Sequence, residues 1–502
     1  MGSRQPSTDL SNEIVIVDNV SIVGDNLTWT RAEVSEQAPR HELLFVFMAG
    51  KLGTGLDFLL CFLKQDAENK EHPFRLSVLR TTQIPSELLD LMVTGLPPHL
   101  QHGVTSKSGI TNHVDIIVST KSGTGLALTV WQDVLQPLWD LVARHKERTD
   151  GLTVDSSKSH YRVTITESPE TVREFSRQLW VPDGGHSCGR TVVLLSGDGG
   201  VVDLLNGSDG DEPPEVPPVI ALLPLGTGNA LFHSTHKPLY SSPGPTPLVH
   251  GLRTLFRGVA HDLPVFRASF SPGSRIVTFA DKSAKSPSAA VDPTQLQKQE
   301  TSVSHLQGAI VASYGFHASI VYESDTPEHR VHGDKRFGMV AQELLRESHA
   351  YAAEVSIRRR GSTAFEVIPR DKHAYVLTAL VSNLERKFTI SPATRPLDSR
   401  LRLVHFGPIG GERTMNVMLK AYEEGSHVGM EWDDGERVGY DEVDEVRITV
   451  LEDDERWRKV CIDGTIVEIP KGGQMSAKML DHIIVRILAD THLWEGQRSS
   501  EL

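Results

Sequence analysis

The sequence predicts a domain of alternating strands and helices, preceded by a small β-rich domain and followed by a long region of antiparallel strands. Buried-type strands alternate with helical stretches between residues 113 and 250, and this alternation is typical of parallel βαβ units. On either side, short runs rich in Val, Ile and Phe are separated by turn residues, as in antiparallel sheets. We therefore expect a disordered tail at 1–12, a β-rich domain at 13–105, an α/β domain at 113–250 and a C-terminal domain at 251–490.

In the β-rich domain, short apolar runs up to about residue 80 predict the strands. The triplet Gly53–Gly55 falls between two such runs, which predicts a hairpin turn. Segment 86–94 is apolar with helical spacing, and Ser86 is its expected N-cap. Segment 97–112 has the composition of a linker to the next domain.

In the α/β domain, predicted strands begin near residues 113, 161, 191 and 219. Helical stretches follow the first three, and the helix after the second strand is expected from about 169 to 180. Parallel units of this kind place their ligand-binding loops beyond the carboxyl ends of the strands.

The C-terminal region is predicted to be mostly strands, including the apolar run 308–322. Two stretches with helical spacing interrupt them, at 337–355 and 413–424. Segment 281–304 has almost no apolar residues, and we expect it to be a mobile insertion. The apolar residues of the helix at 337–355 lie on a shifting face, and packing on the core would explain them.

Composition excludes several classes of protein. The chain has 502 residues, and 51 Lys and Arg against 65 Asp and Glu give a net charge of −14. This balance argues against broad nucleic-acid binding, which needs a basic surface. No apolar run approaches the roughly 20 residues that span a bilayer, and three cysteines are too few for a disulfide framework or a zinc site. We expect a cytoplasmic protein with peripheral membrane contact and leave its oligomeric state open.

Gly-Thr-Gly occurs again in two loops that follow predicted strands. The copy at 123–125 opens a predicted helix, where backbone amides can hold phosphate, although turn geometry alone also explains it. The copy at 226–228 has a partner upstream, where Asp198 stands between Gly197 and Gly199. Neighbouring parallel strands would bring these two loops to one edge of the sheet. A carboxylate there can accept a hydroxyl proton or bind Mg²⁺, and a structural Asp turn is the alternative.

Together, these segments resemble the diacylglycerol kinase catalytic domain, most closely its sphingosine kinase and ceramide kinase branch. The paired signature is SGDGGVVDLLNG at 196–207 with LPLGTGNALFHS at 223–234. Other segments follow in the family's order over about residues 113–485, namely 118–138, 161–170, 314–324 with Arg330 and Arg336 downstream, and VCIDGTIVEI at 460–469. The resemblance implies an α/β nucleotide-binding domain (NAD kinase/diacylglycerol kinase-like) followed by a β-sandwich, with ATP and lipid meeting in the cleft.

The resemblance also implies transfer of the γ-phosphoryl group of Mg-ATP to a primary hydroxyl of a sphingoid base, ceramide or diacylglycerol. Asp198 would be the general base, and Arg330 and Arg336 would contact phosphate oxygens. Asp463 would contact nucleotide and metal, and Asp203 would contact the metal. The lipid would contact Ser196, Ser319 and Val321. The nucleotide would contact Ser119, Thr120, Lys121, Gly123, Thr166, Glu167, Gly197, Gly199, Gly226, Thr227, Gly228 and Asn229.

Each of these residues also has a structural alternative. Arg330 and Arg336 lie in a charged stretch that suits a solvated face. Asp463 precedes a glycine between two predicted strands, as in a common hairpin turn. Asp203 could cap or solubilise its helix, and Thr166 with its neighbours could be an N-cap.

The sequence departs from the family pattern at several positions. Ser119 stands where Asn is usual, Leu126 where a basic residue is usual, and Thr465 where Glu is usual. Ser319 and Val321 occupy positions that are acidic in the sphingosine branch, so a cationic amine would lose its counter-charge there. Two alternatives therefore stay open, a NAD kinase-like phosphotransferase and a catalytically silent lipid- or nucleotide-binding protein.

Overall fold

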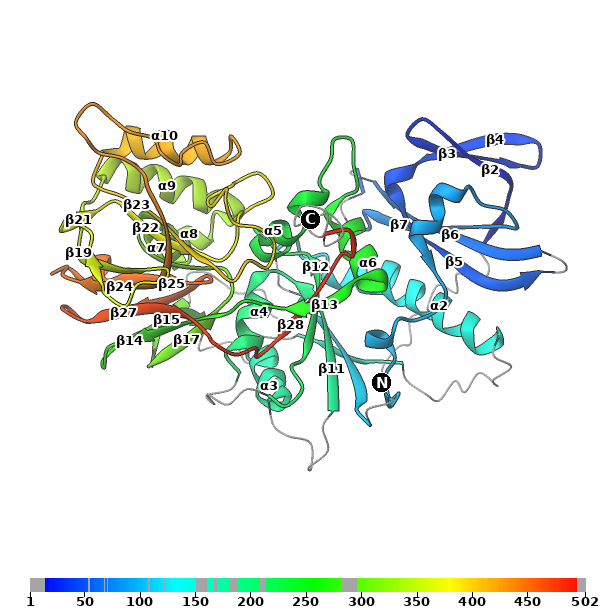
Figure 1. Ribbon diagram of the computed structural model, residues 1–502, viewed down its shortest axis with the longest axis horizontal. Helices are drawn as coiled ribbons and strands as arrows, with labels where there is room; N and C mark the ends of the chain where they lie inside the picture. The colour runs from blue at the N-terminus through cyan, green and yellow to red at the C-terminus, as the bar shows by residue number, and fades with distance from the viewer. Residues whose placement is uncertain are drawn as a thin grey trace.

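The structure is a computed structural model that describes residues 14–52, 55–66, 68–69, 71–106, 109–120, 123–149, 160–166, 169–180, 188–207, 214–281 and 296–493. The tail predicted at 1–12 lies outside these residues. A central α/β domain lies between an N-terminal β-rich domain and a C-terminal domain built around a large sheet (Figure 1). Among the described residues, no helix is both long enough and apolar enough to cross a membrane.

The N-terminal domain has the predicted β-rich character and consists of two sheets. One is an antiparallel sheet of β2 (Asp18–Val23), β3 (Asn26–Arg31) and β4 (Val34–Pro39). The other has the order β1-β7-β6-β5-β8, with β1 (Val15–Ile16), β5 (Leu43–Leu52), β6 (Gly55–Gln65), β7 (Phe74–Thr81) and β8 (Met92–Val93). Trp29, Val46, Phe58 and Leu79 are among the apolar side chains that pack together in this domain.

Two local predictions in this domain have different outcomes. Leu52 pairs with Gly55 across β5 and β6, so the chain reverses where the hairpin turn was predicted. The predicted helix at 86–94 is wrong in type and length, because Ser86–Leu91 form the 3-10 helix η3 and the chain then enters β8. The segment predicted as a linker contains the short 3-10 helix η4 (Pro98–Leu100), and β9 begins within it at Thr111.

The α/β domain is built on one mostly parallel sheet with the strand order β10-β9-β11-β12-β28-β13. The strands are β9 (Thr111–Val118), β10 (Arg162–Ile165), β11 (Cys188–Ser196), β12 (Val219–Pro224), β13 (Val259–Asp262) and β28 (Arg486–Ala489). The helices are α1 (Ala127–Val130), the π-helical turn η5 (Trp131–Leu135), α2 (Gln136–Thr149), α3 (Pro169–Leu179), α4 (Asp198–Leu205), α5 (Ala230–His236) and α6 (Pro247–Arg257). Both β13 and β28 lie beyond the predicted domain limit at 250. Strand β13 follows α6 directly, and β28 joins this sheet when the chain returns from the C-terminal domain.

Alternate side chains of the central strands serve two different cores. Val193 and Leu195 of β11 pack with residues of α2 and α6, and this core continues into the N-terminal domain through Phe45. Val192 and Leu194 point to the other face and pack with α4. Because both faces are covered, the carboxyl ends of the strands are where the loops can form a site.

The C-terminal domain is dominated by a curled, largely antiparallel sheet, which has 14 strands among the described residues. Its central order is β16-β15-β26-β25-β18-β22-β23-β24-β27-β14-β17. The strands are β14 (Phe266–Phe270), β15 (Arg275–Asp281), β16 (Leu296–Ser302), β17 (His305–Gly308), β18 (Val311–Gly315), β19 (Tyr351–Arg359), β20 (Glu366–Val367), β21 (Lys372–His373), β22 (Tyr375–Ala379), β23 (Leu401–Phe406), β24 (Gly439–Val450), β25 (Lys459–Ile462), β26 (Thr465–Glu468) and β27 (Gln474–Met479). The helices are α7 (Phe316–Ser324), α8 (Pro327–Arg330), α9 (Arg336–Glu347) and α10 (Gly411–Ala421).

Three predictions for this domain need correction. The run 308–322 is not all strand, because Gly315 with φ +85° ends β18 and α7 follows directly. The helix predicted at 337–355 ends at Glu347, where Ser348 takes a left-handed conformation, and Tyr351 begins β19. Part of the predicted mobile insertion 281–304 is the strand β16, which pairs with β15; the rest, 282–295, lies outside the described residues.

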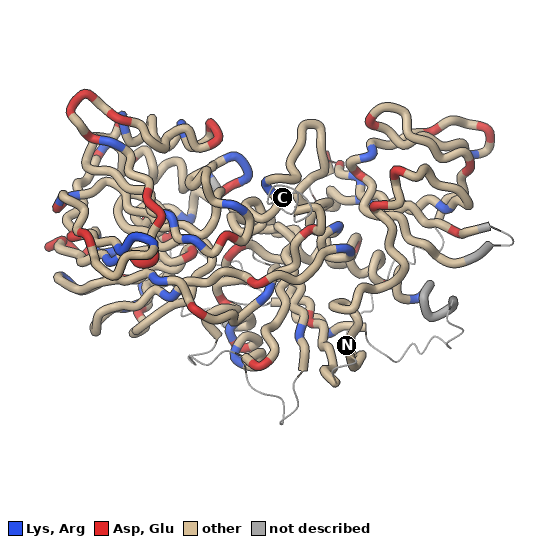
Figure 2. The backbone as a smooth tube through the Cα atoms, in the orientation of Figure 1, with Lys and Arg blue, Asp and Glu red and all other residues tan. Residues whose placement is uncertain are grey.

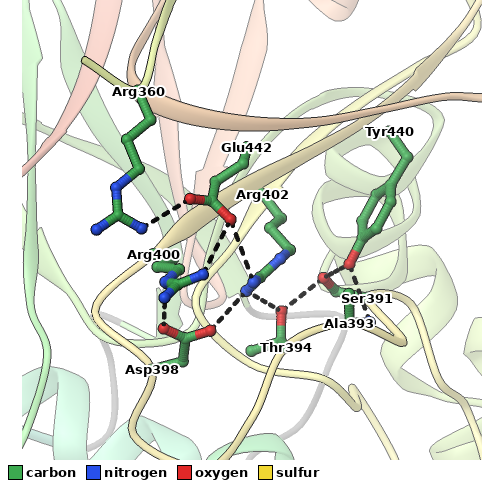
Figure 3. Close-up of polar contacts among 9 residues, drawn as sticks. All are labelled: Arg360, Ser391, Ala393, Thr394, Asp398, Arg400, Arg402, Tyr440 and Glu442. Atoms are coloured by element: carbon green, nitrogen blue, oxygen red, sulfur yellow. Dashed lines mark hydrogen bonds and ion pairs between the residues drawn. The ribbon is translucent and has the colours of Figure 1, made fainter.

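Charged residues of both signs are interspersed along the chain (Figure 2). A network on β23 and β24 illustrates how they pair. Glu442 accepts from Arg360 at 2.8 Å and from Arg402 at 3.4 Å, and Asp398 contacts Arg400 at 3.2 Å (Figure 3). These arginines are therefore bound to carboxylates of their own domain.

Candidate active site

The loops at the carboxyl ends of the parallel strands are tied together by backbone hydrogen bonds. The Ser119 amide donates to the Leu195 carbonyl at 3.1 Å. The Leu225 amide donates to the Ser196 carbonyl, also at 3.1 Å. These bonds extend the ladder of the sheet into the loops, so the loops after β9, β11 and β12 emerge side by side.

The loop after β10 joins this group through two threonines. The Thr120 hydroxyl donates to the Thr166 carbonyl at 2.8 Å, and the Thr120 amide donates to the Thr166 hydroxyl at 3.2 Å. Thr166 is therefore in place beside the first glycine loop. The neighbouring predicted contacts Lys121 and Glu167 lie outside the described residues.

Two glycine loops touch backbone to backbone. A Cβ atom on Gly226 would lie 2.4 Å from the Cα of Gly197, and one on Gly123 would lie 2.5 Å from the Cα of Gly226. A side chain at either position would collide with main chain, which cannot move aside as a flexible side chain can. The two Gly-Thr-Gly loops and the Asp198 loop therefore lie against one another at one edge of the sheet.

Asn229 stabilises the conformation of the Gly226–Gly228 loop. Its side-chain oxygen accepts from the Gly226 amide at 2.9 Å, and its amide group donates to the Gly226 carbonyl at 2.8 Å. Its backbone is left-handed, with φ +54°, a conformation that Asn tolerates better than most residues. Asn229 thus positions the loop, while Thr227 at its tip is exposed.

The Asp198 carboxylate faces the start of α5. One oxygen accepts from the Ala230 amide at 2.7 Å and the other from the Leu231 amide at 3.2 Å. The residue is partly buried, and burial raises the pKa of the Asp198 carboxyl to about 6, although the two amide bonds oppose the shift. Asp198 can therefore exchange a proton near neutral pH.

Asp463 comes from the turn between β25 and β26, with φ +48°. Its oxygens accept from the amides of Ala309 at 2.6 Å, Ile310 at 3.1 Å and Val311 at 2.6 Å. The residue is only 8% exposed. Burial, with a smaller contribution from the charge of Asp198, raises the pKa of the Asp463 carboxyl to about 7, although the three amides oppose the shift.

The charge of Asp198 contributes to the raised pKa of Asp463, so these two carboxyl groups, which come from two domains, are close enough to interact electrostatically. Like charges close together favour the protonated form of one partner, and a cation or a protonated group between them would relieve the repulsion. Among the described residues, no group of three or more His, Cys, Asp or Glu side chains forms a metal cluster. Mg²⁺ commonly takes only one or two protein carboxylates and completes its shell with water and substrate phosphate, so the pair suits such an ion.

A loop of the C-terminal domain also reaches this site, which the sequence did not indicate. A Cβ atom on Gly228 would lie 3.3 Å from the Leu384 carbonyl oxygen and 3.9 Å from Asp198 Oδ2. Two hydrogen bonds between Ser234 and Asn383 stabilise this contact. The Ser234 hydroxyl donates to the Asn383 backbone carbonyl at 3.0 Å and accepts from the Asn383 backbone amide at 2.9 Å. Only the proximity of turns from different domains reveals this contact, and no local motif signals it.

Arg330 and Arg336 have different surroundings. Asp325 binds the Arg330 guanidinium in a bidentate pair at 2.9 and 2.8 Å, and Arg330 also donates to the Phe279 carbonyl at 3.4 Å. Arg336 begins α9, and its buried Nε has no hydrogen-bond partner among the described residues. Arg336 is thus the more available of the two for an anionic ligand.

The predicted lipid contacts lie on α7, next to the strands that carry the Asp463 turn. Ser319 is buried and accepts from the Tyr351 hydroxyl at 2.9 Å. Val321 packs against a small apolar cluster that contains Cys461 and Ile466. Ser196 ends β11 beside Gly197 and is buried.

Asp203 takes no part in the contacts around Asp198 that the structure describes. Its carboxylate forms an ion pair of 3.3 Å with Arg173 of α3. Its role as a metal ligand stays a prediction.

The fold and the site together define an α/β domain whose glycine loops surround a titratable carboxylate at the carboxyl ends of parallel strands. The sequence profile of the diacylglycerol kinase catalytic domain matches residues 113–254. Residues 113–254 therefore match the catalytic domain of the diacylglycerol kinase family, which confirms the resemblance found in the motifs of this part of the chain.

Solved structures of individual proteins are similar to this chain only at low sequence identity. A crystal structure of a diacylglycerol kinase from Bacillus anthracis str. Sterne aligns with a TM-score of 0.43 at 12% identity, over 76% of this chain and 98% of that chain. A second structure from this bacterium, of a protein assigned as a diacylglycerol kinase, aligns with a TM-score of 0.44 at 13% identity and the same coverage. The search of curated proteins gives no match.

Proposed function

We propose that the protein is a lipid kinase that transfers the γ-phosphoryl group of ATP to a primary hydroxyl. The observation that carries this proposal is the Asp198 carboxylate, partly buried between two glycine loops that touch. Its pKa of about 6 suits a general base near neutral pH, where a useful fraction is deprotonated and still basic enough to take a proton.

In this proposal Asp198 accepts the proton of the lipid hydroxyl as the hydroxyl oxygen attacks the γ-phosphorus. Each Asp198 oxygen already accepts one amide from α5 and keeps a further lone pair for the acceptor hydroxyl. The two amides hold the carboxylate in one orientation, so little reorganisation is needed when the substrates bind. The bond from the γ-phosphorus to the bridging oxygen breaks, and ADP leaves.

The nucleotide would lie along the glycine loops. Such turns present backbone amides that hold phosphate, and the exposed Thr227 stands at the tip of one loop. Ser119, Thr120, Gly123, Thr166 and Gly228 line the same edge of the sheet. Arg336, with its unpartnered Nε, is the cation that we expect to meet phosphate, whereas Arg330 would first have to leave Asp325.

Asp463 is the carboxylate that we expect to hold Mg²⁺. When bound, this ion would neutralise charge on the phosphates of ATP. Asp463 is oriented for this role by three amides, and the charge of Asp198 disfavours its ionised form, so a cation beside it would relieve an existing repulsion.

We expect the acceptor to have a neutral head group. Ser319 and Val321 carry no charge, and the Ser319 hydroxyl is engaged by Tyr351. A sphingoid ammonium placed there would be desolvated without a counter-charge, which is costly. Ceramide or diacylglycerol is therefore favoured over sphingosine as the substrate.

The lipid would be taken from a membrane surface. Val331, Phe337 and Met339 are exposed apolar residues at α8 and the start of α9, with exposed fractions of 53, 36 and 36%. They lie next to the cationic Lys335 and Arg336 in sequence. Apolar side chains beside cations suit a peripheral contact with lipid head groups.

The direct test supplies purified full-length protein with radiolabelled ATP, Mg²⁺ and micelles of ceramide, diacylglycerol or sphingosine. We expect labelled ceramide or diacylglycerol, and a fall in kcat of about 10² to 10⁴-fold in Asp198→Asn. Asp262→Asn is a matched control, because Asp262 pairs with Arg486 on the protein surface. Full activity in Asp198→Asn would contradict the assignment of the base.

Two further outcomes would replace the proposal. Label transferred to NAD⁺ but to no lipid would establish a NAD kinase-like activity. Saturable binding of ATP without transfer to any acceptor would establish a silent binding protein, which the substitutions at Ser119, Leu126 and Thr465 would then explain.

A further inference from the structure

A polar cavity of about 320 Å³ lies where the N-terminal domain meets the α/β domain. None of the residues that line it belongs to the loops around Asp198. The N-terminal domain contributes Asp25, Arg40, Glu87 and Asp90, and α6 contributes Arg253. His492 closes the wall after the last described strand, β28.

Three arginines meet at this junction. Arg253 donates through Nε to the Leu43 carbonyl at 3.0 Å, and Arg40 donates to the Glu87 carbonyl at 3.3 Å. Arg257, one helical turn after Arg253, donates to the Asp90 carbonyl. Each guanidinium thus bonds to a peptide oxygen, and in the described part of the chain none of the three pairs with a carboxylate within 4.0 Å.

In the described part of the chain, these three arginines therefore lack a direct carboxylate partner, although carboxylates stand nearby. Burial and the charges of Arg257 and Arg40 lower the pKa of Arg253 to about 10, while the buried Asp490 opposes them. The other charged groups that face the cavity are Asp25, Glu87 and Asp90, with the titratable His41 and His492. Cations and anions thus stand on the wall of one cavity without forming ion pairs with one another.

We propose that this cavity binds a small phosphorylated compound that also carries hydroxyl or ammonium groups. Its phosphate would contact Arg40 and Arg253, because guanidinium groups match phosphate oxygens in geometry and charge. Its hydroxyl or ammonium donors would contact the carboxylates of Asp25, Glu87 and Asp90. The cavity volume lies at the lower end of the range for small-molecule sites, about 300 to 1,000 Å³, and leaves room for more than a bare phosphate.

The site is distinct from the proposed transfer of phosphate and does not depend on it. Its ligand would touch the N-terminal domain and α6 together, so binding would stabilise the junction of the two domains. A ligand that binds only the folded protein raises its melting temperature, and the rise grows with the logarithm of the ligand concentration above the Kd. Unfolding therefore reports on this site whether or not the protein has kinase activity.

The test uses the full chain and measures binding by calorimetry and by the shift in Tm at constant ionic strength. The probes are inorganic phosphate, glycerol 3-phosphate and phosphoethanolamine, and phosphatidylcholine vesicles with and without phosphatidic acid. We expect saturable binding that weakens at least about tenfold in Arg40→Gln, the loss expected for one charge-assisted contact. Arg31→Gln is the control, because Arg31 is exposed in the same domain and, among the described residues, its guanidinium has one ion-pair partner, Glu36, at 4.0 Å.

A second variant, Asp25→Asn, is tested beside Arg40→Gln, because Arg253→Gln could unfold the junction. Asp25→Asn should weaken the binding of glycerol 3-phosphate but not the binding of inorganic phosphate. Arg40-dependent binding of the soluble probes alone identifies a free metabolite, and Arg40-dependent binding of the phosphatidic acid vesicles identifies a lipid head group. Absence of binding of every probe, or equal binding by Arg40→Gln and the native protein, would overturn the proposal.

Discussion

Asp198 and Asp463 hold their carboxylates in similar ways but on different supports. Asp198 stands at the start of α4 and accepts two amides from the first residues of α5. Asp463 stands in a hairpin turn and accepts the amides of three consecutive residues before and within β18. Asp198 as a residue is partly exposed, whereas Asp463 is buried.

This difference suits Asp198 to a role in the reaction and Asp463 to a role in holding the surrounding backbone. An enclosed carboxylate with three amide donors is needed to satisfy those donors, whatever else it does. An open carboxylate with two donors can accept a third hydrogen bond from a substrate. The comparison therefore predicts that Asp463 contributes more to stability and Asp198 more to the rate of reaction.

The largest expected effect on stability comes from Asp463→Ala. The change leaves the amides of Ala309, Ile310 and Val311 without their acceptor, and each unsatisfied buried donor costs about 1 to 3 kcal/mol. We expect the free energy of unfolding to fall by about 3 kcal/mol or more, measured by urea denaturation. Asp198→Ala should cost clearly less, because two amides rather than three lose their acceptor. Equal losses in the two variants would contradict the comparison.

Gly226→Ala tests whether the backbone contact between the loops supports both carboxylates. The new Cβ would lie 2.4 Å from the Cα of Gly197, so the loops must separate. We expect a loss of about 1 to 3 kcal/mol, typical of overpacking, together with weaker binding of ATP. Gly199→Ala is the matched control for stability, because a Cβ there meets no atom within 4 Å.

The pH dependence distinguishes activity from stability. Both carboxyls have raised pKa values in the folded protein, about 6 for Asp198 and about 7 for Asp463, so between about pH 4 and 7 the native state binds more protons than the unfolded state. Stability therefore falls as pH rises through this window, whereas kcat/KM rises, by up to about tenfold per pH unit below pH 6.

Two variants assign these two pH effects to separate residues. Asp463→Asn should flatten the fall in stability, and Asp198→Asn should remove the rise in kcat/KM. Chemical denaturation and steady-state rates from pH 4.5 to about 8 measure them. A pH profile of kcat/KM that Asp198→Asn leaves unchanged would assign the rise to another group.

The smallest predicted effect concerns the contact that joins the two domains near the site. Ser234→Ala removes a hydrogen bond to the Asn383 carbonyl and the acceptor of the Asn383 amide. We expect a loss of about 1 kcal/mol in the free energy of unfolding and a modest rise in the KM for the lipid. Ser35→Ala, at an exposed position of β4, should change neither quantity.

Much of the site was readable in the sequence because its parts are local. The strands 113–120 and 191–197 are buried-type apolar runs, and the glycines and Asp198 follow them directly. Parallel pairing then brings the loop ends together, as the register of β11 with β9 and β12 confirms. Helix α7 was misread as strand, because it is buried on several sides and lacks a polar face to show its period.

Other parts depend on residues far apart in the chain. Arg330 is paired with Asp325 rather than free in solvent, and the return of β28 to the α/β sheet has no signal in the sequence around residue 486. The amides that hold Asp463 belong to the segment 309–311, some 150 residues earlier. No periodicity or motif encodes such a pairing.

The sequence alone determined which residues end the parallel strands, since turn glycines and a single acid after an apolar strand express local backbone preferences. Only the tertiary structure decided that Asp463 lies near enough to Asp198 to feel its charge, that Leu384 lies against Gly228, and that three arginines gather at the junction of two domains. These arrangements follow from how separate sheets and helices pack, and packing depends on the shape of whole surfaces rather than on neighbouring residues in the chain.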